Sequence, residues 1–207
     1  MPSYHLSTTS EPPAETLIAD LCCLIVDVQT TGASPRHGSI IEIGWSEAIP
    51  ERTSYELSPL SSRLVRPPRG ARIPKVVTKL TGLTRQRLKT ATAPAQVAEL
   101  LWDQLFKIYD RVAAGESWVW LAHLARFERS FIRPLLLAHP PSNTQQDATE
   151  VIELMDMLPW VCTHAISQRR LPTAPRRTIS AMNGFFTGPV ITHKRVDAHV
   201  EATALIW

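Results

Sequence analysis

The stretch LCCLIVDVQTTG, residues 21–32, decides the fold of this 207-residue chain. Residues 21–28 are apolar except for Asp27, which is typical of a central strand buried on both faces. Thr30, Thr31 and Gly32 then break the strand. The sequence therefore predicts a buried central strand that ends in a polar turn just after Asp27.

The segments on either side extend this strand into a sheet. SIIEIGW (39–45) is predicted to be a second strand and residues 61–65 a third, with residues 49–58 as a loop between them. Apolar residues then recur about every 3.6 positions, which predicts a long amphipathic helix over residues 95–113. WVWLA (118–122) is predicted to be the fourth strand. The short spacing of the first three strands predicts an antiparallel meander that opens the sheet.

After the first three strands, helices and strands are predicted to alternate along the chain. Residues 151–157 are predicted to form either a fifth strand or a short helix. Helices are expected at 127–137, 160–169, 178–186 and 194–207, with a loop at 140–146. This pattern indicates an α/β domain with a mixed sheet over residues 14–207, preceded by a disordered lead-in, residues 1–13. The last helix reaches Trp207 without a terminating Gly, Asn or Pro, so the domain could be truncated or part of a longer protein.

Composition limits the class of protein. No run of 18 apolar residues and no secretory signal is present, so we expect a soluble, cytoplasmic protein that does not enter a membrane. Cys22, Cys23 and Cys162 suit neither a disulfide framework nor a four-ligand zinc site. Two stretches without carboxylates, 57–98 and 157–196, hold fifteen of the 22 basic residues. Such segments suit a polyanion such as nucleic acid, or they are solvated loops.

Four islands in this order resemble the motifs of the DEDDh class of 3′→5′ exonucleases, the family of the proofreading epsilon subunit of bacterial DNA polymerase III. They are IVDVQTTG with IIEIG (25–32, 40–44), IPKVVTKLTGLT (73–84), AHLARFERSFI (122–132) and HKRVDAHVEATALI (193–206). The family patterns are D-x-E-T-T-G, I-P-x-x-x-x-x-L-T-G-I-T, A-H-N-x-x-F-D-x-x-F-L and H-x-A-x-x-D-A-x-x-T-A. The resemblance implies a ribonuclease-H-like fold, a central mixed five-stranded sheet flanked by helices.

The resemblance also implies a catalytic site. Family members hydrolyse the terminal phosphodiester with two Mg²⁺ or Mn²⁺ ions about 4 Å apart, held by four carboxylates, with a motif histidine as general base. Carried over by position, Asp27 and His193 are retained and Glu128 replaces an aspartate. The added methylene of Glu128 displaces its carboxylate by about 1.5 Å.

Two positions of that set are degenerate. Gln29 stands where the family has glutamate, and Ala198, five residues after His193, stands where it has its last aspartate. The formal charge of the set falls from −4 to −2, which weakens the binding of two hard cations. Glu201 and Asp197 are the neighbouring carboxylates that could complete an altered site.

The resemblance further implies nucleic-acid contacts. In the family the L-T-G segment lies beside the 3′ nucleotide. The corresponding candidates here are Thr30, Thr31, Leu80, Thr81, Arg85 and Arg87. The partner expected from this is a single-stranded 3′ end of DNA or RNA.

Three hypotheses follow. The first is a domain that binds nucleic-acid 3′ ends with weak or absent catalysis and no required metal, serving a larger protein or complex. The second is an active metal-dependent 3′→5′ exonuclease that uses Asp27, Glu128, His193 and either Asp197 or Glu201. The third is a non-catalytic protein-interaction module. Retained Asp27 and His193 favour the first two, and the losses at Gln29 and Ala198 favour the first.

Overall fold

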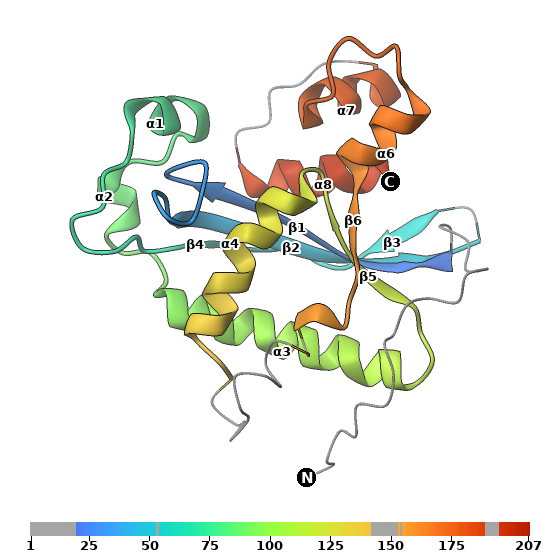
Figure 1. Cartoon of the computed structure of the whole chain (residues 1–207), viewed down its shortest axis with the longest axis horizontal. Coiled ribbons are helices and arrows are strands. Elements are labelled where there is room, and N and C mark those ends of the chain that lie inside the picture. Colours follow the sequence, from blue (N-terminus) through green and yellow to red (C-terminus); the bar gives the residue numbers. More distant parts are fainter. Residues whose placement is uncertain (1–19, 53, 142–152, 154, 189–194) are drawn as a thin grey trace.

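A mixed sheet forms the centre of the computed structural model, which describes residues 20–52, 54–141, 153, 155–188 and 195–207 (Figure 1). The sheet has six strands in the order β3-β2-β1-β5-β6, with β4 also paired to β2. Their bounds are β1 (Cys22–Thr30), β2 (Ile40–Pro50), β3 (Tyr55–Leu57), β4 (Ser61–Leu64), β5 (Trp118–Ala122) and β6 (Trp160–Cys162). The predicted mixed α/β sheet is confirmed, with six strands instead of five.

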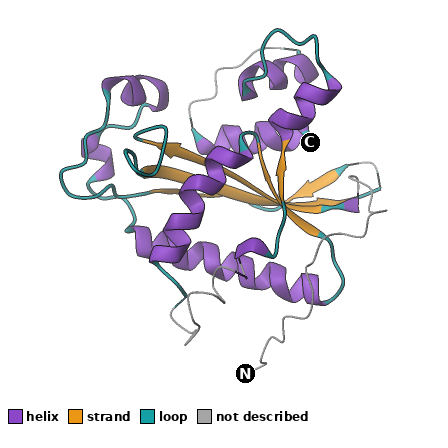
Figure 2. Cartoon of the chain, viewed as in Figure 1, coloured by secondary structure: helices purple, strands orange, loops and turns teal. Residues whose placement is uncertain are grey.

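Helices cover both faces of this sheet (Figure 2). Their bounds are α1 (Lys75–Thr81), α2 (Arg85–Leu88), α3 (Pro94–Ala113), α4 (Ala125–Ala138), α6 (Thr163–Arg170), α7 (Ile179–Thr187) and α8 (Val196–Ile206). α3 and α4 bury the larger core on one face, and α8 packs on the other. None of these described helices is long and apolar enough to cross a membrane.

β1 is the central strand that its apolar sequence predicts. It pairs antiparallel with β2 and parallel with β5. Because side chains alternate along a strand, Leu24 and Val26 enter the core under α3 and α4, whereas Cys23 and Ile25 face α8. The same alternation puts Asp27 and Gln29 on the face that α8 covers.

Two elements differ from the sequence-based expectation. The segment 49–58, predicted as a loop, continues β2 to Pro50 and contains β3. The edge strand lies at Trp160–Cys162, where a helix was predicted to begin, and among residues 151–157 the described Glu153, Met155 and Asp156 are helical. Trp160 stacks on Trp120 with ring centroids 4.8 Å apart while β6 pairs with β5, so tertiary pairing overrides the local pattern.

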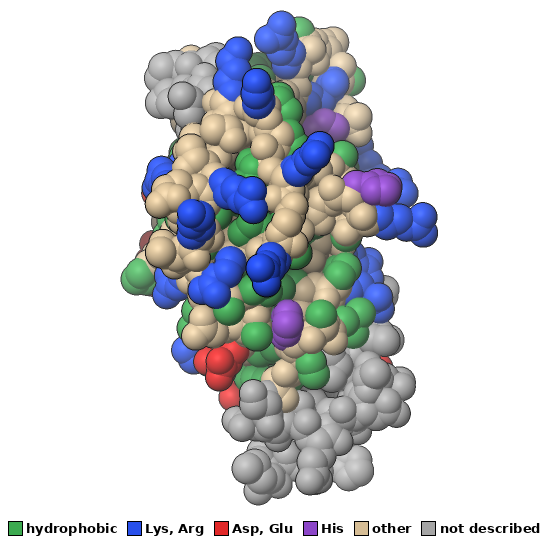
Figure 3. All heavy atoms as spheres, turned by 90° about the vertical axis from the view of Figure 1, so that its left-hand side faces the viewer, with side chains coloured by type: hydrophobic (Ala, Val, Ile, Leu, Met, Phe, Trp, Pro, Cys, Tyr) green, Lys and Arg blue, Asp and Glu red, His purple; other side chains and the backbone are tan. Residues whose placement is uncertain are grey.

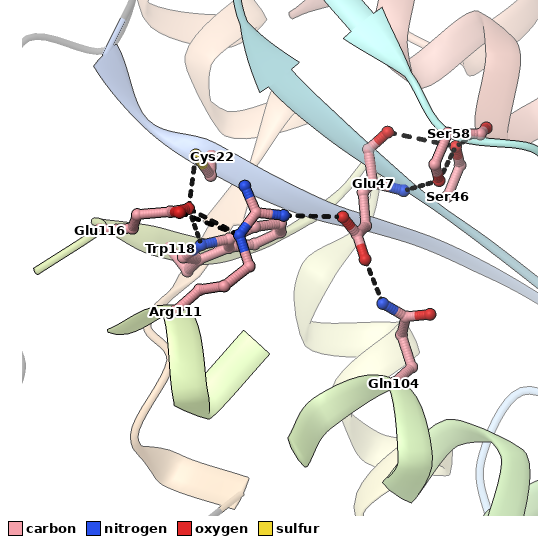
Figure 4. Close-up of polar contacts among 8 residues, drawn as sticks. All are labelled: Cys22, Ser46, Glu47, Ser58, Gln104, Arg111, Glu116 and Trp118. Atoms are coloured by element: carbon pink, nitrogen blue, oxygen red, sulfur yellow. Dashed lines mark hydrogen bonds and ion pairs between the residues drawn. The ribbon is translucent and has the colours of Figure 1, made fainter. Parts of the chain in front are cut away.

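A polar cluster ties α3 to the sheet at the end opposite Asp27 (Figure 4). The Arg111 guanidinium bridges Glu116 at 2.8 Å and Glu47 at 3.1 Å, and lies 4.6 Å from the centre of the Trp118 ring. Glu47 also accepts a hydrogen bond from Gln104 of α3. This cluster fixes the helix against β1 and β2 far from the candidate site.

Candidate active site

Asp27 and Gln29 lie at the end of β1, on the face covered by α8. Asp27 is only 8% exposed. Gln29 Nε2 lies 3.4 Å from Asp27 Oδ2, and in the sheet Gln29 is paired with Glu42 of β2. The retained carboxyl and the first degenerate position are therefore in direct contact.

Glu128 reaches the same end of the sheet from the first turn of α4. Its Oε2 accepts a hydrogen bond of 2.8 Å from the backbone N–H of Val28, the residue after Asp27. The pairing of β5 with β1 stops at Ile25 and Leu121, so the Val28 N–H has no strand partner on that side and the Glu128 carboxylate takes the place of one. The structure thus brings Glu128 and Asp27 together.

The third contribution comes from the first turn of α8. His199 Nδ1 lies 3.1 Å from Asp27 Oδ2 and 3.3 Å from Gln29 Nε2. A neutral imidazole nitrogen donates a hydrogen bond only when it carries the proton. When His199 Nδ1 is protonated, Asp27 Oδ2 accepts one hydrogen bond from it and a second from the Gln29 amide. The α8 side chain that meets Asp27 is therefore an imidazole.

The α8 residue in contact with Asp27 is His199, one residue after the position that the sequence analysis assigned to the missing aspartate. Ala198, predicted there, is adjacent in sequence to the residue that meets Asp27. Asp197 and Glu201 are both exposed, and Asp197 Oδ1 accepts a hydrogen bond from the backbone N–H of Ala198. His193, the predicted general base, lies outside the described residues.

The sequence contained a signal for His199 that the spacing from His193 obscures. If the family's D-A-x-x-T-A is aligned through Thr203 and Ala204 instead, its aspartate falls on position 199. Alignment through His193 puts the motif aspartate at position 198, whereas alignment through Thr203 and Ala204 puts it at 199. The contact between His199 and Asp27 agrees with the second alignment. In that alignment His193 lies six residues before the aspartate position, instead of the five in the family pattern.

A second residue of α8, Arg195, was not predicted to have a role. Its guanidinium makes a bidentate ion pair with Glu42, with Nε 2.7 Å and 2.9 Å from the two carboxylate oxygens. Glu42 is only 2% exposed. A buried carboxylate beside Asp27 is thus neutralised by the residue that precedes α8.

Burial dominates the electrostatics of the two site carboxyls. It raises the pKa of Asp27, an effect opposed by the hydrogen bond with His199. It raises the pKa of Glu128 well above its usual value, and the nearby Asp27 carboxyl raises it further. Two carboxyls in one dry site disfavour simultaneous ionisation.

These residues do not fit the pair of divalent cations that the family resemblance implies. The possible metal ligands are two carboxylates, one amide and one imidazole. One oxygen of Asp27, Oδ2, is already in hydrogen-bond contact with His199 and Gln29. In the described part of the chain, no group of three or more His, Cys, Asp or Glu is arranged to hold a metal ion. Two hard cations require more carboxylate charge than this.

The predicted nucleic-acid residues divide into two groups. Thr31 accepts a hydrogen bond from Ser39 N–H, Thr30 donates to the Gly32 carbonyl, and Thr81 donates to the Val77 carbonyl at the end of α1. These hydroxyls are engaged inside the chain. Leu80, Arg85 and Arg87 are exposed, with Leu80 at 63%.

Lys and Arg side chains are spread over the side of the molecule that carries α1 and α2 (Figures 1 and 3). The segment from β4 to the residue after α2 contributes nine exposed basic side chains, here called the basic face: Arg63, Arg66, Arg69, Arg72, Lys75, Lys79, Arg85, Arg87 and Lys89. Among the residues that the structure describes, no carboxylate forms an ion pair with any of these nine. Leu83 and Leu88 anchor this segment on Ile41 of β2, one residue from Glu42, so the basic face adjoins the Asp27 end of the sheet.

Comparison with known proteins identifies the fold. No protein-family model and no curated protein matches the sequence. Among solved structures, the zinc-bound complex of Escherichia coli exonuclease I with single-stranded DNA superposes with a TM-score of 0.68 at 13% identity, covering 89% of this chain and 39% of that one. A 3′-exonuclease in a structure of 3′-end-specific recognition of histone mRNA stem-loop gives 0.64 at 15% identity, covering 93% and 65%. Cell-death related nuclease 4 gives 0.56 at 16% identity, covering 89% and 62%.

The chain spans less than two thirds of the length of each of these proteins. All three are nucleases. The ribonuclease-H-like exonuclease fold that the four sequence islands imply is thereby confirmed.

Proposed function

We propose that this chain binds single-stranded 3′ ends of nucleic acid through an exonuclease-fold domain that hydrolyses them poorly or not at all. The observation that carries the proposal is the basic face of nine exposed side chains without a described ion-pair partner, next to the Asp27 end of the sheet. Cations that have no ion pair in the described part of the chain are candidates to bind backbone phosphates. The solved neighbours with single-stranded DNA or an RNA stem-loop support the same ligand class.

An apolar element inside this face favours a single strand over a duplex. Val76 and Leu80, four residues apart on α1, are 60% and 63% exposed, and each directly follows a lysine, Lys75 or Lys79. Apolar side chains flanked by cations suit unstacked bases whose phosphates are held on either side. A duplex would offer the same phosphates but no free base face.

The second part of the proposal, weak hydrolysis, rests on the site itself. Metal-assisted cleavage needs ligands that hold cations where the attacking and leaving oxygens will be. Gln29 and His199 stand beside Asp27 where more carboxylate charge would be needed. The alternative, an active metal-dependent nuclease, would have to recruit Asp197 or Glu201, whose side chains are exposed.

Fluorescence anisotropy with 5′-labelled 20-mers of DNA and RNA tests the binding. We expect binding of single strands, weaker binding to strands with a blocked 3′ end, and affinity that falls steeply with salt. Arg85→Glu with Arg87→Glu should weaken binding at least several-fold, whereas the same charge change on α6, Arg169→Glu with Arg170→Glu, is the matched control. Equal effects of the two pairs would show that the basic face has no special role.

The same labelled strands test hydrolysis. With Mn²⁺ present, shortened products should be absent or should accumulate more slowly by orders of magnitude than with an intact family member. Robust digestion that is lost in Asp27→Ala would establish the active-nuclease alternative.

A further inference from the structure

Two buried carboxylates at this site each receive a nitrogen group from the start of α8. Arg195 pairs with Glu42, and His199 contacts Asp27. Arg195 is the residue just before α8, and His199 in the first turn of α8 donates its backbone N–H to the Arg195 carbonyl at 3.2 Å, so both side chains reach the sheet from the same end of the helix. Glu42 is paired with Gln29 and Asp27 with Gly44, which makes the two carboxylates neighbours on adjacent strands.

The exposed fractions of the four side chains show that both carboxylates are buried beneath their nitrogen partners. The side chains of Asp27 and Glu42 are 11% and 2% exposed, against 18% for His199 and 31% for Arg195. A buried carboxylate is costly unless charge and hydrogen bonds compensate it. Here Arg195, His199 and Gln29 supply that compensation from within the chain.

We propose that His199 occupies the fourth ligand position of the exonuclease fold, and that His199 and Gln29 hydrogen-bond Asp27 in place of a divalent cation. The site then assembles without metal. This inference deepens the proposed function, and it adds that nucleic-acid binding requires no divalent ion.

Helix geometry separates position 199 from its neighbours. Successive residues are 100° apart around a helix, so a carboxylate at 198 or 200 cannot replace one at 199 in front of Asp27. Asp197 and Glu201 lie two positions away on either side and are exposed. Restoring acidic ligands should therefore create a cation site only when the change in α8 is made at 199.

The test is a Mn²⁺ titration of the full chain by isothermal calorimetry, with thermal unfolding at 0 and 5 mM Mn²⁺ alongside. For the natural sequence we expect no saturable binding and a shift in Tm below about 1 °C. For Gln29→Glu with His199→Asp we expect saturable binding and a rise in Tm of about 5 °C or more, the size given by a ligand near 100 times its Kd. Gln29→Glu with Ala198→Asp is the matched control and should behave like the natural sequence.

Saturable Mn²⁺ binding by the natural sequence would overturn the proposal, as would a gain by the 198 variant that equals or exceeds the gain at 199. If the 199 double variant is unfolded at every Mn²⁺ concentration, the single changes His199→Asp and Ala198→Asp give the same comparison with less added charge. No gain at 199 in either format would also overturn it.

The metal titration contains no nucleic acid, so it decides the inference even if the chain binds no strand. A second arm addresses the link to function, with anisotropy measured in 5 mM Mg²⁺ and in EDTA at matched ionic strength. Equal affinities are expected. Binding that requires Mg²⁺ would contradict the proposed metal independence while leaving the proposed ligand intact.

Discussion

Val196 of α8 packs so closely on Gly44 of β2 that a Cβ atom placed at Gly44 would lie 2.8 Å from Val196 Cγ2 and 3.1 Å from Val196 Cβ. Gly44 is the strand partner of Asp27. The approach of the helix at this point sets how near Arg195 comes to Glu42 and His199 to Asp27. A residue without a side chain in β2 therefore positions the side chains of α8.

Replacing Gly44 by alanine should lift the start of α8 from the sheet. The added methyl meets a branched carbon that cannot rotate away, so we expect a loss of about 1–3 kcal/mol in the free energy of unfolding. Thermal and urea unfolding measure it. Gly44→Ala combined with Val196→Ala is the control: it should be at least about 1 kcal/mol more stable than the sum of the single effects predicts. Simple additivity would show that the close contact does not constrain the helix.

Removing only Arg195 from its ion pair with Glu42 should lower the free energy of unfolding more than replacing both residues. Arg195→Met leaves the buried Glu42 carboxylate without its partner, and we expect a loss of about 2–3 kcal/mol because Arg195 itself is partly exposed to water. Arg195→Met with Glu42→Gln should recover part of that loss. Urea unfolding of the four proteins in this cycle gives the coupling. A double variant less stable than Arg195→Met would contradict the assigned burial cost.

Most of the fold could be predicted from the sequence because its central elements have strong local patterns. The apolar run of β1 is compatible only with a buried strand, and the 3.6-residue period of α3 only with an amphipathic helix. Both elements begin and end within two residues of the expected bounds. β3 and β6 were missed because strands of three residues have too little pattern, and pairing with β2 and β5 creates them.

The candidate site was less predictable than the fold. Asp27, Gln29 and Glu128 are singled out by motifs at β1 and at the start of α4, and the structure places Gln29 beside Asp27 and Glu128 on the neighbouring Val28 N–H. The contact of His199 depends on the rotation of α8, which the seat of Val196 on Gly44 sets and which a one-residue ambiguity in the motif hides. The pairing of Arg195 with Glu42 joins residues 153 positions apart and has no sequence signature.

Glu128 should make the stability of the chain depend on pH. Burial raises the pKa of Glu128 in the folded state above its unfolded value of about 4.3. The folded state then binds the proton more tightly than the unfolded state, so stability is greatest below the unfolded pKa and falls as pH rises towards the folded pKa. Glu128→Gln removes this titration, and its amide oxygen can still accept from Val28 N–H. We expect the variant to be the more stable protein at pH 8, with the advantage vanishing near pH 4.

Thermal unfolding of both proteins between pH 4 and pH 8 measures this effect. Glu116→Gln is a control of opposite sign. Burial alone would raise the pKa of Glu116, but hydrogen bonds from Arg111 and Trp118 lower it overall. The stability that Glu116 contributes is therefore present above its unfolded pKa and lost as pH falls, so this variant should be the weaker protein at pH 7. A constant difference between Glu128→Gln and the natural sequence at all pH values would exclude the buried ionisation.

The basic and apolar parts of the nucleic-acid face should have separable effects on binding. Each phosphate contact to a single strand contributes about −0.7 to the slope of log K against log salt concentration. Arg85→Gln with Arg87→Gln should therefore reduce the steepness of that slope by about 1.4 if both side chains contact phosphates. Leu80→Gln changes no charge and should lower affinity by about 1 kcal/mol, the order expected for losing the burial of part of a leucine side chain against a base, with the slope unchanged. Anisotropy titrations from 50 to 200 mM NaCl distinguish the two, and Leu57→Gln, an exposed leucine on β3, is the neutral control. A slope that changes with Leu80→Gln, or one that stays constant in the double arginine variant, would mean that the strand does not cross this face.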